Sequence, residues 1–418
     1  MSVRSRVMAK AAGVLLAGAM GAGCAYDRGV PAGEWPLVSG RPPHNLVAAE
    51  VADYEPGVDY FPDKVTFSHA RQIAVTYHGS YKTARITTRG AGEQFEYVFV
   101  QRGTPRPPVS PDARVIAVPV RRFSLGTFRY GRAAQRLGIV DRLVAFSNHT
   151  HTTVPEILQL FESGALTRNA DTEAIVNRRS EAHFNWHYPA RLSRADDTYA
   201  RMGVPLIDMA EHLEPTPLAR AEWVKFLALF FNKEAEAEQL FAELEQAYTA
   251  LAARVAGTVS RPRVLVGTPQ GDGWRVYGGA NVHARLIEDA GGHYLWAGDP
   301  SANSGRDVPL EDALTRARAA DVWIIGPDSA FGPRVGEVTV GDPRYGYVPA
   351  VRNDRVFIGH RNFPAGPNPW WDEALVNPHR ELADHIRMIH PELPLPDDTE
   401  PLQFYRQLQV VQTTRRAP

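Results

Sequence analysis

The pattern of apolar residues predicts alternating strands and helices from residue 114 onward. Short continuous apolar runs, which are typical of strands buried in a parallel sheet, occur in the first half at 115–120, 142–147, 182–186 and 205–209, and in the second half at 263–267, 293–296, 321–325 and 355–358. Helical patterns are found at 126–137, 155–163, 171–179, 280–290, 309–320 and 374–390. This alternation predicts an α/β protein with two lobes, each built on a parallel sheet.

A different pattern lies between the two halves, in residues 214–257. After the pair Thr216-Pro217, which predicts a helix start, neither glycine nor proline occurs until the segment's last residue. We expect Asn232 to cap a second helix over 233–256, which would span roughly 36 Å at 1.5 Å per residue. Such a helix would join the two lobes with little freedom to bend at a hinge.

The residues before the first lobe have less periodicity. Residues 63–101 are rich in β-branched and aromatic side chains, which predicts a small antiparallel sheet. The predicted order is a signal peptide at 1–23, a tether and irregular segment at 24–62, the small N-terminal β region with a proline-rich linker at 63–113, the first lobe at 114–215, the helical segment at 216–257, the second lobe at 258–408 and a tail at 409–418.

The N-terminus predicts export. A basic start is followed by a run of small and apolar residues that is too short to span a bilayer. Cys24, the only cysteine of the chain, follows Gly21-Ala22-Gly23 and resembles the lipidated residue of a bacterial lipoprotein. The alternative is an ordinary secretory signal. We expect a periplasmic protein that is lipid-anchored through Cys24 and has no other contact with the membrane.

Composition and motifs give no support to several functions. The 418 residues carry a formal net charge of −1, which gives no support to a nucleic-acid partner. The chain has neither a phosphate-binding P-loop, nor a G-x-S-x-G nucleophile motif, nor an H-E-x-x-H zinc motif. We therefore predict a protein that is not an enzyme and has no cofactor.

Arginine, histidine and aromatic residues follow several of the predicted strands. In open α/β sheets, ligands contact the loops at the carboxyl ends of strands. Guanidinium groups bind carboxylates and phosphates, and aromatic rings form flat apolar walls. The predicted ligand-binding residues are Arg121, Arg122, His149, His151, His187, Tyr188, Trp274, Tyr277, Arg361 and Trp370. They suit an anionic, partly aromatic ligand. A second interpretation stays open, in which a metal ion is bound directly by His149, His151 and His187.

Five stretches, in this order, resemble the substrate-binding proteins of ABC importers for iron–siderophore complexes, cobalamin and haem. They are RLGIVDRLVAFS at 136–147, MGVPLIDMAEHLEPTPLARAEWVKFLALFFNKEAEAEQLF at 202–241, LIEDAGGHYLW at 286–296, VPLEDALTRARAADVWIIG at 308–326 and HPEL at 390–393. The resemblance covers about 63–408 and includes the strand YVFVQ at 97–101. It implies two Rossmann-like lobes joined by one long helix, with the ligand in the cleft between them.

The resemblance also implies partners. Proteins of this family dock on a membrane permease through one acidic residue on each lobe, and the matching positions are Glu173 and Glu311. Both acids also lie near predicted helix starts, where a negative charge is stabilising in any case. The expected ligand is an iron(III) chelate, the expected partners are an ABC permease and its ATPase, and the expected state is a monomer.

Two other functions remain open. One is a zinc- or manganese-binding importer protein that uses His149, His151 and His187 as ligands. The other is an exported α/β hydrolase with dispersed catalytic residues.

Overall fold

The structure is a computed structural model that describes residues 35–88, 92–147, 151–187, 198–199, 201–258, 260–300, 305–326, 343–362, 366–395 and 401–408. The predicted signal peptide and Cys24 lie outside these residues. No helix in the described part of the chain is long and apolar enough to cross a membrane.

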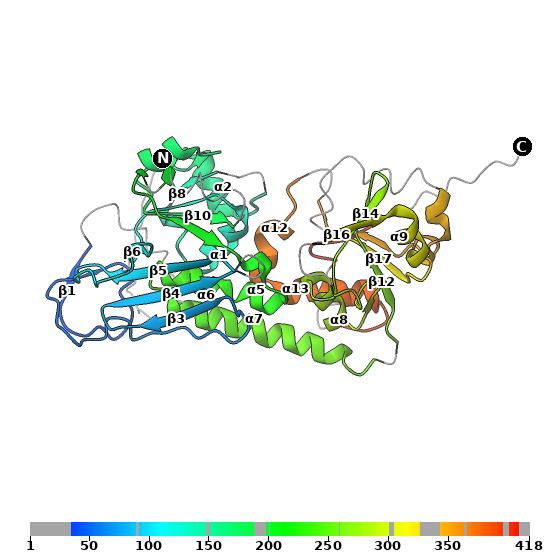
Figure 1. The fold of residues 1–418 in the computed structure, drawn as a ribbon, viewed down its shortest axis with the longest axis horizontal. Coiled ribbons are helices and arrows are strands. Elements are labelled where there is room, and N and C mark those ends of the chain that lie inside the picture. The colour runs from blue at the N-terminus through cyan, green and yellow to red at the C-terminus, as the bar shows by residue number, and fades with distance from the viewer. Residues whose placement is uncertain are drawn as a thin grey trace, which may run out of the picture. The chain divides into compact units, whose positions relative to one another are not determined.

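Two parallel sheets form the lobes and confirm the predicted fold class (Figure 1). The first lobe has the order β11-β10-β7-β8-β9, made of Leu206–Met209, Ala182–Trp186, Phe123–Leu125, Leu143–Phe146 and Thr167–Arg168. The second has the order β15-β12-β17-β18-β19, made of His293–Tyr294, Arg263–Val266, Val322–Ile325, Val356–Ile358 and Arg406–Gln407, and its edge strand β19 is antiparallel. The helices that connect these strands are α1 (Gly131–Arg136), α2 (Pro155–Glu162), α3 (Thr172–Asn177), α8 (Val282–Asp289), α9 (Leu310–Ala317), α11 (Pro349–Arg352), α12 (Trp370–Glu373) and α13 (Pro378–Ile389).

The linking segment contains three helices, α5 (Pro217–Ala221), α6 (Trp223–Leu229) and α7 (Glu234–Val255). The side chain of Thr216 accepts a hydrogen bond from the amide of Ala219, which confirms the predicted cap of the first helix. The 22 residues of α7 are the long helix. The prediction that Asn232 caps α7 is wrong, because the cap position is Lys233 and Asn232 has a positive φ of 56°.

The start of α7 is held by an anchor network of buried polar side chains. The ammonium of Lys82 pairs with the carboxylate of Glu234, and both side chains are fully buried. Asn232 accepts a hydrogen bond from Lys82 Nζ at 3.0 Å and donates one to Gln101 at 2.9 Å. Asn45 donates to the second oxygen of Glu234 at 2.8 Å. These bonds fix α7 to the N-terminal sheet.

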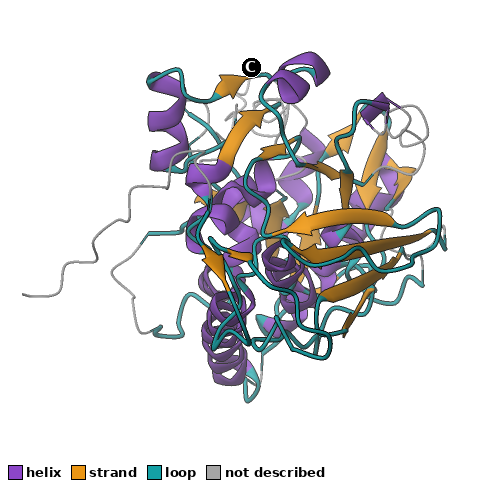
Figure 2. Cartoon of the chain, turned by 90° about the vertical axis from the view of Figure 1, so that its left-hand side faces the viewer, coloured by secondary structure: helices purple, strands orange, loops and turns teal. Residues whose placement is uncertain are grey.

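That N-terminal sheet has the order β3-β4-β5-β6, made of Ile73–Tyr77, Tyr81–Thr87, Gln94–Gln101 and Arg114–Val118 (Figures 1 and 2). The run at 115–120 was predicted as the first strand of the first lobe, and this assignment is wrong, because β6 pairs with β5 in this sheet. A continuous apolar run has the same appearance whichever sheet buries it. Tyr97 and Phe99 of the sheet contact Phe226 and Phe230.

Residues 35–62, predicted as part of a tether, are also packed. The short strands β1 (Leu37–Val38) and β2 (Glu50–Val51) pair with each other, and Tyr60 is fully buried. A further antiparallel sheet was not predicted in the second lobe. It has the order β13-β14-β16 and is made of Pro269–Gln270, Gly273–Val276 and Arg306–Pro309.

Candidate functional site

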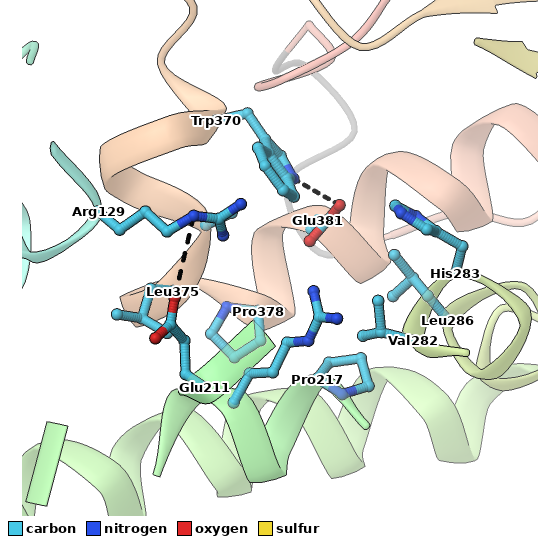
Figure 3. Close-up of a pocket in the computed structure, with 12 residues that line it drawn as sticks. Arg129, Glu211, Pro217, Val282, His283, Leu286, Trp370, Leu375, Pro378 and Glu381 are labelled. Atoms are coloured by element: carbon cyan, nitrogen blue, oxygen red, sulfur yellow. Dashed lines mark hydrogen bonds and ion pairs between the residues drawn. The ribbon is translucent and has the colours of Figure 1, made fainter. Parts of the chain in front are cut away.

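A pocket lies where the first lobe, the linking segment and the second lobe meet (Figure 3). Its polar lining comes from Arg129, Glu211, Arg220, His283, Trp370 and Glu381, and its apolar lining from Pro217, Val282, Leu286, Ala374, Leu375 and Pro378. Its free volume is about 30 Å³. We call it the interlobe pocket.

Arg129 reaches the pocket from the carboxyl edge of the first sheet. It lies in a 3-10 turn, Phe128–Tyr130, that begins after β7, where ligand-contacting loops are expected. Its guanidinium carbon lies 4.5 Å from the ring centre of Trp186, 5.2 Å from that of Trp370 and 4.9 Å from that of Trp371. Cation–π contacts of this kind hold a guanidinium in place and leave its charge intact.

Two buried acids line the same pocket. Glu211 accepts a hydrogen bond from the hydroxyl of Tyr130 at 2.8 Å, and one of its oxygens lies 3.9 Å from Nε of Arg129. Burial raises the pKa of Glu211, while the charge of Arg129 opposes that shift. Glu381 on α13 accepts a hydrogen bond from the indole of Trp370 at 2.7 Å, and burial raises its pKa to about 7. The pocket therefore combines cations, aromatic rings and carboxyl groups, one of which titrates near neutral pH.

The second lobe contributes Trp370 and its neighbours through α12.

Two of the predicted ligand-binding residues lie beside the pocket. Tyr277 does not line it, but the ring centre of Tyr277 lies 5.1 Å from that of His283, which lines the pocket. His151 lies beside Trp371, with 6.2 Å between ring centres, and burial lowers its pKa. Of the predicted ligand-binding residues, Trp370 lines the pocket, and Tyr277 and His151 border its aromatic side chains.

Other predicted residues lie elsewhere. Because β6 belongs to the N-terminal sheet, Arg121 and Arg122 precede the first strand of the lobe sheet and lie at its amino edge. Arg121 forms an ion pair with Glu50 and lies over the ring of Trp35. Arg361 is exposed.

Trp274 and His187 are buried away from the pocket lining. Trp274 lies on β14, donates a hydrogen bond to the carbonyl of Val266 at 3.0 Å and packs against Trp323. Strand β14 was not predicted from the sequence. Its alternating pattern directs the Trp274 side chain into the core. The Nε2 and Nδ1 atoms of His187 lie 3.1 Å from a carboxylate oxygen of Glu93 and 3.6 Å from one of Asp208, respectively.

The described residues contain no group of three side chains suited to holding a metal ion. His149 and Tyr188 lie outside those residues, so the three-histidine site stays a prediction. The two predicted docking acids are both exposed. Glu173 is in the first turn of α3, and Glu311, in the first turn of α9, pairs with Arg344.

Five pocket residues were not predicted as ligand-binding residues from the sequence: Arg129, Glu211, Arg220, His283 and Glu381. Arg129 had a usable signal, since it follows a strand, but that strand, β7, was not predicted, because the run at 115–120 was predicted as the first strand of the lobe. Glu381 had none, because it lies inside a helix that was predicted only as the last helix of its lobe.

Part of the sequence matches the model of a known protein family. The sequence model of the family described as periplasmic binding protein matches residues 197–362, from the last strand of the first lobe through the linking helix and most of the second lobe. The match covers less than half of the 418 residues.

Solved structures share the two-lobed fold of this chain. It is similar to a crystal structure of a periplasmic binding protein from Veillonella parvula, with a TM-score of 0.55 and 11% identity over 74% of this chain and 98% of the other. It is also similar to Helicobacter pylori CeuE in a nickel–histidine complex, with a TM-score of 0.51 and 15% identity over 66% of this chain and 85% of the other.

A sequence relative is an uncharacterized lipoprotein of Methanocaldococcus jannaschii, 28% identical over 46% of this chain. The match spans only 44% of that relative's length.

Proposed function

We propose that this protein is the substrate-binding protein of an ABC importer and that it captures an iron(III) chelate in the interlobe pocket. The observation that carries the proposal is the meeting of Arg129 and Arg220 with Trp370 and His283 between two lobes. A ferric chelate with carboxylate or phenolate donors presents negative charge and flat apolar surface. Guanidinium groups and indole rings complement both features.

Native mass spectrometry of protein purified from its own cell envelope tests the ligand class. We expect a co-purifying mass with the isotope pattern of iron, and its loss in an Arg220→Ala variant. Arg318→Ala is the matched control, because Arg318 is an exposed arginine outside the pocket. A bound metal-free compound, or the same iron content in both variants, would contradict the proposal.

The same proposal assigns permease docking to Glu173 and Glu311. Both carboxylates are exposed on different lobes, and the pair that Glu311 forms with Arg344 would be exchanged for an arginine of a membrane partner. Reconstituted with its permease and ATPase, the Glu173→Arg variant should stimulate ATP hydrolysis less than the unaltered protein does. Glu162→Arg on the neighbouring helix α2 should leave the stimulation unchanged. Equal stimulation by both variants would exclude Glu173 as a docking residue.

The proposal also places the protein at a membrane through a lipid on Cys24. A Cys24→Ala variant should move from the membrane fraction to the soluble fraction of lysed cells. Retention in the membrane fraction would contradict lipid anchoring.

A further inference from the structure

The interlobe pocket is too small for the ligand that its chemistry favours. Its free volume of about 30 Å³ holds a water molecule or two, whereas pockets for drug-sized ligands measure about 300–1,000 Å³. Part of the pocket lining must therefore move before a chelate enters. The long helix α7 argues against a wide hinge motion, because its start is held by the anchor network and its length contacts α13 of the second lobe.

One short element of the pocket lining is attached in an unusual way. Helix α12 belongs to the second lobe by its position between β18 and α13, and Asn368 just before it donates a hydrogen bond to the carbonyl of Gly359 at 2.7 Å. Its acidic side chains, however, are bonded to the first lobe. In Figure 1, α12 lies between the two lobes.

Two carboxylates form this attachment. Asp372 accepts a hydrogen bond from the amide of Thr153 at 2.5 Å and another from the Thr153 hydroxyl at 2.9 Å. Glu373 accepts one from Arg132 at 2.8 Å. Asp372 is fully buried, while Arg132 and Glu373 remain partly exposed.

Aromatic contacts complete the attachment next to the pocket. Trp371 meets Phe128 of the first lobe edge to face, with 5.2 Å between ring centres, and both Trp370 and Trp371 cover the guanidinium of Arg129. The helix therefore covers the arginine that is best placed to bind an anionic chelate.

We infer that α12 is a clasp: it closes the interlobe pocket by bonding to Thr153 and Arg132 of the first lobe, and it must release them to admit the ligand. The attachment consists of these hydrogen bonds and the contacts of two indole rings, so opening it exposes much less apolar surface than separating the lobe cores would. Release uncovers Arg129 and removes Trp370 from the pocket without any change in the angle between the lobes. That the clasp must open rests on the proposed function, because it follows from the size of a chelate, but the bonds that form the clasp do not.

Hydrogen exchange of the protein beginning after Cys24 tests the clasp without a ligand. In an Asp372→Ala/Arg132→Ala double variant, amides of residues 366–376 should exchange at least about tenfold faster than in the unaltered protein. Asp321→Ala, which removes an exposed ion pair with Arg263 in the second lobe, is the control and should leave this segment unchanged. Thr153→Val removes only the hydroxyl bonds and should give a smaller increase, which keeps the test decisive if the double variant unfolds.

A distance measurement separates the clasp from hinge motion. Spin labels on Gln159→Cys in α2 and Thr315→Cys in α9, both exposed, report the separation of the lobes. The distance should be the same with and without the clasp bonds. A large change in distance, or unchanged exchange in both Asp372→Ala/Arg132→Ala and Thr153→Val, would overturn the inference.

Ferric citrate serves as the ligand probe. If it binds, the double variant should bind it at least about tenfold faster than the unaltered protein, and equal rates would overturn the clasp as an entry device. If it binds neither protein while the exchange rates differ as expected, the clasp stands and the proposed ligand class loses support.

Discussion

At the start of α7, Lys82 and Glu234 are buried together with Asn45 and Asn232, and every member of this anchor network bonds to another member. In the interlobe pocket, Arg129 is buried against indole rings, and the acids Glu211 and Glu381 receive their hydrogen bonds from a phenol and an indole rather than from a cation. The same residue types thus form a permanent joint in one place and a responsive surface in the other. The difference lies in the partners: the charges of the anchor network are paired within one folded unit, whereas Arg129 lies among indole rings at the junction of two lobes, with Glu211 3.9 Å from its Nε.

The largest effect should come from breaking the anchor network. In Lys82→Met, the carboxylate of Glu234 stays buried without its cation, which should lower the free energy of unfolding by about 3–5 kcal/mol. Urea unfolding measures the loss. The Lys82→Met/Glu234→Leu double variant should recover much of it, and a double variant as unstable as the single one would show that the network is not a paired unit.

A smaller effect, dependent on pH, should come from the pocket. Burial raises the pKa of Glu381 to about 7 from a usual 4.5, so the folded protein binds a proton that the unfolded chain has already lost in this range. The stability that this group contributes is complete below about pH 4.5 and falls by up to about 3 kcal/mol as the pH rises to 7.

Urea unfolding between pH 4.5 and 8 measures this dependence. Glu381→Gln should have a flatter stability profile than the unaltered protein, while the buried acids Asp372 and Asp384 contribute equally to both. Parallel profiles would show that Glu381 is not protonated in the folded state at neutral pH.

An effect of about 2 kcal/mol should come from Glu222 in the linking segment. Its carboxylate accepts hydrogen bonds from the backbone amides of Ser68, His69 and Ala70 at 2.9, 2.8 and 2.7 Å. Glu222→Gln keeps the shape but removes the charge and one acceptor, and hydrogen bonds to charged groups contribute about 1.5–3 kcal/mol each. Thermal unfolding tests this, with the exposed Glu243→Gln on α7 as the control.

The smallest effect on global stability should come from the clasp. Arg132→Gln removes a partly exposed ion pair with Glu373, which should lower the free energy of unfolding by less than about 1 kcal/mol. Calorimetry should show a nearly unchanged unfolding temperature. A loss similar to that of Lys82→Met would mean that the clasp is a permanent joint as well.

The sequence predicted regular elements well where the signal was local. The strand at 182–186 and the helix start at Thr216-Pro217 depend on apolar periodicity and capping, which are properties of neighbouring residues. Membership of a sheet is not local, and the run at 115–120 was therefore placed in the wrong one. That single shift moved the expected ligand-binding arginines from position 129 to positions 121 and 122. Trp370 was predicted from its place after a strand, but Glu381 becomes a pocket residue only when α13 packs beside α12.

The contact of the N-terminal sheet with Phe226 and Phe230 has a consequence for the ancestry of the protein. Helix α6 is buried on every side, so a descendant that lost residues 63–118 would expose an aromatic surface on its linking segment. Loss of the sheet therefore requires polar replacements at these two positions in the same lineage. Among homologous chains, the sheet and the aromatic pair should be inherited or lost together.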